Sequence, residues 1–179
     1  MARKAKAQAS MLGIIMGVLV LACCIAAIVG VCIDEWTVTK SAALGFESEI
    51  QTSFGDHSDK VKDLTDNGYE FEDKETLLPT MVAFGYIAAI AAAALAILYL
   101  LKMVLNIGLF RFIVGIGGIA TLIIGAILIG VTASYCENMI SFSFGQFASS
   151  ETVIGLGAYL TSIGTMAGGL CAVIGCARK

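Results

Sequence analysis

The sequence predicts an all-α membrane protein, a left-handed four-helix transmembrane bundle that carries a small extracellular β-rich domain formed by two outer loops. Hydrophobic residues make up 58% of the chain and charged residues only 14%, with a mean hydropathy of +0.90, so the chain has too few polar side chains to cover a water-soluble core of this size. Four apolar stretches are each long enough to cross a hydrocarbon layer of ~30 Å as a helix. The acidic residues lie in only two of the segments between these stretches.

Each apolar stretch is expected to be a helix, because a segment in lipid must satisfy all its backbone N–H and C=O groups internally. The only proline, Pro79, stands at the entry to the second stretch and leaves the helix interiors unbroken. No ionisable side chain interrupts the apolar runs, which argues against an ion path through the middle of the bundle. The predicted spans are Met11–Ile33, Pro79–Leu101, Phe112–Tyr135 and Thr152–Cys176.

The charges outside the spans predict the orientation of the chain. Segments 1–10, 102–111 and 177–179 carry seven Lys and Arg residues and no acid, whereas loops 34–78 and 136–151 carry all fourteen Asp and Glu residues and four lysines. The positive-inside rule therefore places both termini and the 102–111 turn in the cytoplasm and the two acidic loops outside. We expect the plasma membrane as the location.

The large outer loop is expected to begin with two short strands bent at Ala42–Gly45, because it is rich in Thr, Val, Ile and Phe with partial alternation. Further along, a helical turn is expected at Lys60–Leu64, and Asn67–Gly68 is a turn signal. Asp73 could cap a short helix at Lys74–Leu78. Residues that share a face in the two strands are Trp36, Val38 and Lys40, then Phe46, Ser48 and Ile50.

Aromatic residues are frequent in both outer loops, and some of them are expected to form a small core. The predicted packing residues of the outer domain are Trp36, Phe46, Phe54, Tyr69 and Phe71. The second loop contains ISFSFGQF, whose alternation indicates a strand edge or hairpin arm. Candidate partner contacts there are Phe142, Phe144 and Phe147, since exposed apolar patches mark interaction sites.

Small residues one helical turn apart predict close packing between the helices, because small side chains let backbones approach in lipid. Contacts within one bundle are the main interpretation, and contacts between copies are the alternative. The predicted packing glycines are Gly13, Gly17, Gly117, Gly125, Gly164 and Gly168.

Six cysteines raise the question of redox chemistry. Cys32 and Cys136 end the first and third spans at the outer boundary, so they are a candidate disulfide if their helices face each other. A membrane-embedded thiol oxidoreductase that uses this pair is the alternative function. The other four, Cys23, Cys24, Cys171 and Cys176, lie within the spans and are expected to behave as small apolar residues.

No metal, cofactor or catalytic constellation is predicted. The single histidine, His57, lies in DHSDKVKDLTD, which lacks the central glycine and terminal glutamate of an EF-hand loop. A solvated acidic face is the main interpretation of this segment, and weak binding of a divalent cation is the alternative.

The position of the lone tryptophan fits a known family. Family-like positions are Trp36 just beyond the first span, Leu77, Leu78 and Pro79 before the second, and Gly157, Ala158, Tyr159 and Leu160 at the fourth. In these positions and in its topology the chain resembles the claudin-like tetraspans, which include claudins, myelin-type proteins and gamma-type auxiliary subunits of channels. The resemblance implies that Trp36 lies on the first strand and covers the top of the bundle, whereas a simple anchor at the membrane–water boundary is the alternative. Claudins have a Gly-Leu-Trp triplet and two cysteines in this loop; here no cysteine occurs between Ile33 and Tyr135, so tight-junction sealing and a paracellular pore are not inferred.

The function expected from the sequence is non-enzymatic association through the outer domain. It could serve lateral assembly, adhesion at a cell junction, or attachment as an auxiliary subunit to a larger membrane complex such as a channel. The expected partners are membrane lipid and either a second copy or such a complex, with no nucleic acid and no small-molecule substrate.

Overall fold

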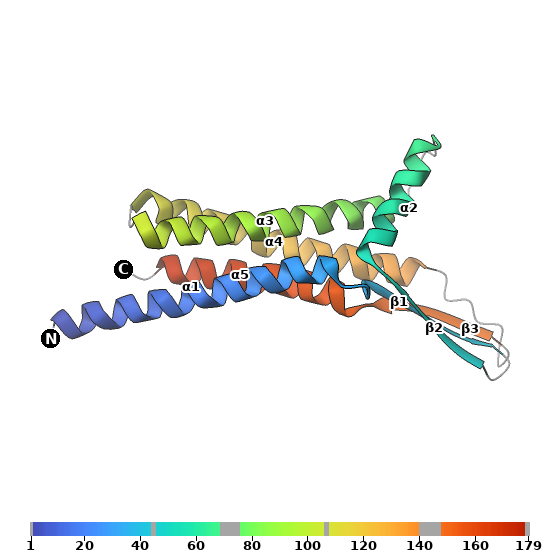
Figure 1. Cartoon of the computed structure of the whole chain (residues 1–179), viewed down its shortest axis with the longest axis horizontal. Helices are drawn as coiled ribbons and strands as arrows, with labels where there is room; N and C mark the ends of the chain where they lie inside the picture. Colours follow the sequence, from blue (N-terminus) through green and yellow to red (C-terminus); the bar gives the residue numbers. More distant parts are fainter. Residues whose placement is uncertain (1, 44–45, 69–75, 106–107, 140–147, 178–179) are drawn as a thin grey trace.

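The computed structural model describes residues 2–43, 46–68, 76–105, 108–139 and 148–177. Four long helices lie side by side, and a small sheet and a short helix lie at one end of them (Figure 1). We call this the sheet end; the first long helix begins and the last long helix ends at the opposite end. The elements in chain order are α1 (Ala2–Cys32), β1 (Thr37–Ala43), β2 (Phe46–Thr52), α2 (Phe54–Asp66), α3 (Leu77–Leu105), α4 (Gly108–Asn138), β3 (Ala148–Ile154) and α5 (Leu156–Ala177).

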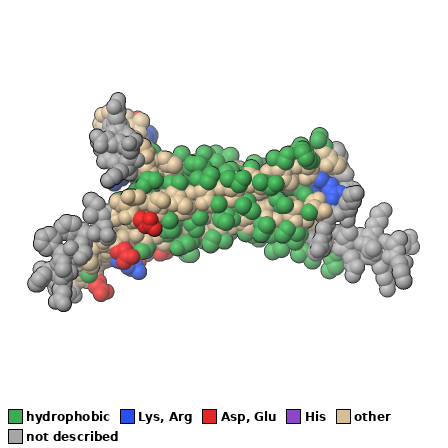
Figure 2. All heavy atoms as spheres, turned by 180° about the vertical axis from the view of Figure 1, so that it is seen from behind, with side chains coloured by type: hydrophobic (Ala, Val, Ile, Leu, Met, Phe, Trp, Pro, Cys, Tyr) green, Lys and Arg blue, Asp and Glu red, His purple; other side chains and the backbone are tan. Residues whose placement is uncertain are grey.

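The four long helices support an integral membrane protein. By length and composition, α3, α4, α5 and residues Gly13–Cys32 of α1 could each cross a membrane. Hydrophobic side chains cover the middle of the bundle on the face drawn in Figure 2, and acidic side chains gather toward the sheet end. The predicted fold class is therefore confirmed at the level of a mostly helical chain with four candidate membrane-spanning helices and a small sheet.

The start of the fourth span differs from the expectation. Thr152 was expected to open a helix, but residues 152–154 belong to β3 and α5 begins only at Leu156. Thr, Val and Ile are β-branched side chains that suit a strand. Gly155 then provides the close approach that the junction needs, because a Cβ there would overlap the backbone of Glu35 and Trp36.

Helix α5 packs closely against both α1 and α4. A Cβ built on Gly164 would lie 2.7 Å from the carbonyl oxygen of Cys23 in α1, and one on Gly125 of α4 would lie 2.8 Å from the carbonyl oxygen of Ser162. Gly17 and Gly168 also face neighbouring helices. These contacts stabilise one chain's own bundle, as small residues do in lipid.

The prediction of packing within the bundle is wrong for Gly13, since a Cβ there would meet nothing within 4 Å. A Cβ on Gly117 would make an ordinary contact with Leu95 of α3, at 3.7 Å. The sequence pattern missed closer contacts. Glycines that face each other across helix pairs are Gly30 with Gly157 and Gly118 with Gly169.

The three strands form one antiparallel sheet in the order β2-β1-β3. The register places Lys40 of β1 directly opposite Glu49 of β2 and Glu151 of β3. The first two strands match the expected pair, and residues 44–45 of the expected bend lie outside the described residues. Strand β3 comes from the segment before the fourth span, so the sheet joins the two loops.

Helix α2 is longer than the expected turn at Lys60–Leu64. Ser53 caps its start, where its hydroxyl oxygen accepts a hydrogen bond from the Asp56 N–H at 3.0 Å and the Asp56 carboxylate accepts one from the Ser53 N–H at 3.0 Å. Asn67 ends the helix and Gly68 follows with a φ of 73°, a left-handed conformation that favours glycine. The candidate cap Asp73 lies outside the described residues.

Candidate functional site

Trp36 fills the junction between the sheet and the helices. Its side chain is 0% exposed. Its backbone N–H donates to the Thr52 carbonyl at 2.9 Å, and its own carbonyl accepts from the Gly155 N–H at 2.9 Å, so the residue just before β1 ties the ends of β2 and β3 together. Complete burial differs from the placement expected of a boundary anchor, whose ring would reach the membrane–water interface.

Phe54 continues this junction from the first residue of α2. Its ring centroid lies 4.6 Å from that of Trp36 and 4.9 Å from that of Tyr86. The ring sits over Gly85 of α3, where any Cβ would overlap it. Because Ser58 is also hydrogen-bonded to Tyr86 at 2.9 Å between hydroxyl oxygens, the first turns of α2 are fastened to α3.

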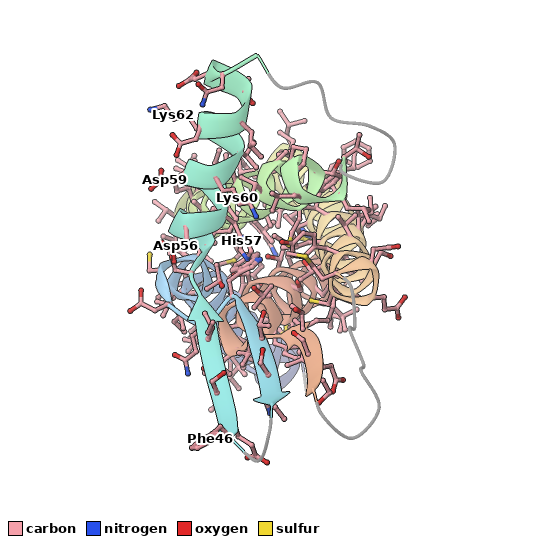
Figure 3. All side chains as sticks on the ribbon, turned by 90° about the vertical axis from the view of Figure 1, so that its right-hand side faces the viewer. Phe46, Asp56, His57, Asp59, Lys60 and Lys62 are labelled. Atoms are coloured by element: carbon pink, nitrogen blue, oxygen red, sulfur yellow. The ribbon has the colours of Figure 1, made fainter. Side chains whose placement is uncertain are left out.

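The burial of His57 was not predicted from the sequence. The acids around it are exposed, as expected of a solvated face, but the His57 side chain is only 4% exposed (Figure 3). Its Nε2 is hydrogen-bonded to the Thr37 hydroxyl at 2.9 Å, and its ring meets that of Tyr135 edge-on at 5.6 Å. The signal was the spacing of Phe54, His57 and Val61, which is that of one helix face.

Burial, and to a lesser extent nearby Lys60, lower the pKa of His57 to about 4, while Asp56 opposes the shift. His57 is therefore neutral at physiological pH. In one neutral tautomer Nε2–H donates to the Thr37 hydroxyl oxygen, and in the other the Thr37 hydroxyl donates to Nε2. The pKa of Asp56 is lowered by hydrogen bonds from the side chain and backbone of Ser53.

Phe46, which was expected to pack within the outer domain, is 81% exposed. It stands at the end of β2 that is farthest from the bundle, at the tip of the sheet (Figure 3). No described core reaches that far, so this packing prediction is wrong. The remaining aromatic predictions, Tyr69, Phe71, Phe142, Phe144 and Phe147, lie outside the described residues.

The sheet has two faces of different chemistry, because directly opposite residues of antiparallel strands share a face. One face is uncharged: the Thr39 and Thr152 hydroxyls are hydrogen-bonded at 3.0 Å, and Ile50 on the same face is 60% exposed. The other face is charged. Its charged residues are Lys40, Glu47, Glu49 and Glu151.

The candidate disulfide is not formed. Cys32 is exposed at the end of α1, whereas Cys136 is buried in the core that contains Trp36 and Tyr135, and both are free thiols. The physical reason is their different surroundings, because the Cys32 side chain is exposed and the Cys136 side chain is enclosed by the core. The structure therefore gives the thiol oxidoreductase alternative no paired thiols at this position.

Within the described ranges, no group of three or more His, Cys, Asp or Glu side chains could hold a metal ion.

At the end of the bundle opposite the sheet, Lys102 donates to the Gly175 carbonyl at 2.9 Å and Arg111 donates to the Cys176 carbonyl at 3.1 Å. Two cations therefore cap the last turn of α5.

Comparison with protein-family models, with curated proteins and with solved structures found no match.

Proposed function

We propose that this chain is a non-catalytic, four-span membrane protein whose sheet end mediates association with other proteins. The observation that carries the proposal is the exposure of β2. All but the last of its seven residues are exposed, including Phe46 and Ile50. A strand that combines an open edge with exposed apolar side chains offers both backbone hydrogen-bonding groups and apolar surface to a partner.

The way the sheet is built supports this function. The junction of Trp36, Phe54 and His57 fastens the sheet and α2 to the bundle through contacts with α3 and α4. A binding surface held by such contacts loses little conformational entropy when a partner docks. The described helices contain no Asp, Glu, Lys, Arg or His at mid-span, so in this proposal the bundle acts as a support for this surface.

The proposal includes the orientation and location expected from the charges. The sheet end, which carries the acidic loops, faces the outside of a plasma membrane, and both termini face the cytoplasm. In this proposal the chain is a distant claudin-like tetraspan, and packing around Trp36 takes the place of the missing cysteine pair. Lateral assembly, adhesion and attachment to a channel-like complex all use the same surface.

The test is native mass spectrometry of the full chain, extracted in mild detergent from the membranes that produce it. We expect assemblies heavier than one chain, and a Phe46→Ser, Ile50→Ser double variant should lose them. The matched control is Met139→Ser, which changes a partly exposed side chain at the sheet end but outside β2. A single-chain mass for the unaltered protein, or equal loss in the control, would contradict the proposal.

A further inference from the structure

The residues of β2 determine which partner chemistry can pair with it. We infer, on the basis of the association proposed above, that β2 pairs with an extended segment of another protein that alternates basic and apolar side chains, rather than with a second copy of this chain.

Strand β2 has one open edge among the described residues. Its inner edge pairs with β1 along all seven residues, from Phe46 opposite Ala43 to Thr52 opposite Thr37. In the described part of the chain, no strand pairs with the outer edge. An open edge offers N–H and C=O groups to an added strand, which provides affinity through the backbone and selectivity through alternate side chains.

The charged face of β2 selects for basic residues. Glu47 lies opposite Ala42, and Glu49 lies opposite Lys40, which also faces Glu151 on its other side. This face thus carries three carboxylates and one ammonium group, around a surface hollow of about 500 Å³ that these four residues help to line. Lysine or arginine at two alternate positions of an added strand would lie directly opposite Glu47 and Glu49, where opposite charges stabilise a cross-strand pair.

A second copy does not meet this requirement. Antiparallel pairing of two β2 strands along their whole length would centre on Glu49 and place it opposite its own copy. A shift to a centre at Ser48 would place Glu47 opposite Glu49. Like charges directly opposite each other destabilise a sheet, and the two acidic loops of each copy, with a net charge of −10, repel one another before contact.

The other face of β2 selects for apolar residues at the positions between the basic ones. Phe46 and Ile50 are exposed there with Ser48 between them, and the neighbouring hydroxyls of β1 and β3 are already hydrogen-bonded to each other. An apolar side chain placed over Ile50 buries surface without leaving a polar group unpaired.

The experiment measures binding of a fluorescent, end-blocked seven-residue peptide of alternating lysine and valine to the full chain in dodecyl maltoside. The comparison peptide alternates glutamate and valine. We expect the lysine peptide to bind, more weakly as salt rises, and to lose about tenfold or more in affinity for a Glu47→Lys, Glu49→Lys variant, as two cross-strand charge pairs imply. The glutamate peptide should bind that variant better than the unaltered protein.

The control variant is Asp59→Lys, Asp63→Lys, which makes the same change in net charge on the exposed side of α2. It should keep its affinity for the lysine peptide. A lysine peptide with N-methyl groups at alternate residues cannot pair along an edge and should not bind. Equal loss of affinity for the lysine peptide in both variants, or binding of the N-methylated peptide, would overturn the inference that β2 pairs with a basic strand. Neither outcome bears on the association itself, which the native mass measurement tests.

Discussion

The hydroxyl of Thr37 lies 2.9 Å from Nε2 of His57, and this hydrogen bond joins the first residue of β1 to the first turns of α2. Both residues are almost fully buried, at 2% and 4% exposure. The edge-on contact with Tyr135 adds α4 to the same group. Three elements from separate parts of the chain therefore meet around the only histidine.

Acidification should weaken this junction between pH 6.5 and about 4. The pKa of His57 is lowered from 6.5 to about 4 in the folded protein, so above pH 6.5 the folded and unfolded states are both neutral at this residue. As the pH falls below 6.5 the unfolded chain takes up a proton and the folded chain does not, so the free energy of unfolding decreases, by about 3 kcal/mol in total. Below about pH 4 this residue causes no further loss.

The measurement is thermal unfolding of the purified protein from pH 7.5 to 4. His57→Gln keeps a hydrogen-bonding side chain but cannot be protonated, so its stability should change little over this range. The pKa of Asp56 is lowered in the folded protein, so the stability that its carboxylate contributes is lost only as the pH falls below its ordinary pKa of 3.8. This loss lies below the pH range of the His57 effect. Parallel pH curves for the two proteins would contradict the assignment to His57.

Removal of the Trp36 ring should detach the sheet without preventing insertion of the helices. Trp36→Ala leaves a cavity beside Phe54 and costs about 3 kcal/mol or more. Limited proteolysis should then cut the segment that contains β1 and β2 faster, while the chain still fractionates with membranes. Phe46→Ala is the control, since its exposed ring supports no core. Unchanged protease resistance in Trp36→Ala would mean that the ring does not hold the sheet.

The helices and the first two strands could be predicted because their signals are local. Long apolar runs fix the spans, and the alternation around Lys40 and Ile50 fixes a strand pair. The third strand could not be predicted, because Thr152 continues the apolar run of the fourth span. Only the pairing of Thr152 with Thr39 shows that this segment belongs to the sheet.

The residues of the candidate site also differ in how far their burial could be predicted from the sequence. Trp36 and Phe54 were predictable as packing residues because aromatic side chains in a short loop need burial. The burial of His57 was not predicted, because the four acidic residues near it indicated a solvent-exposed segment. Its burial depends on the contact between α2 and Thr37. Phe46 and Phe54 are both aromatic residues of the large outer loop, so the sequence predicts burial for both. The exposure of Phe46 depends on how far the sheet extends beyond the helices.

A side chain at Gly164 should force α1 and α5 apart. In Gly164→Ala the new Cβ would lie 2.7 Å from the Cys23 carbonyl oxygen and 2.8 Å from the Ala27 nitrogen, and such overpacking costs roughly 1–3 kcal/mol. Gly13→Ala is the matched control in α1, where the Cβ meets nothing within 4 Å and better helix propensity should leave stability equal or slightly higher. Thermal unfolding in detergent compares them, and equal losses would contradict the close α1–α5 contact.

Loss of the Lys102 charge should loosen the end of α5 opposite the sheet. Its Nζ donates to the Gly175 carbonyl at 2.9 Å and lies 4.4 Å from the centre of the Tyr99 ring, so it satisfies a terminal carbonyl and complements the helix dipole. Lys102→Met keeps the aliphatic stem but removes both interactions, and it should lower the free energy of unfolding by about 1–2 kcal/mol. Lys62→Met removes an equal charge from the exposed surface of α2 and should change stability by no more than about 0.5 kcal/mol. Amide hydrogen exchange reports the loosening of the last turn of α5 directly. The exchange rate there should rise in Lys102→Met and not in Lys62→Met. An equal rise in both variants would show that net charge, rather than the cap, stabilises this turn.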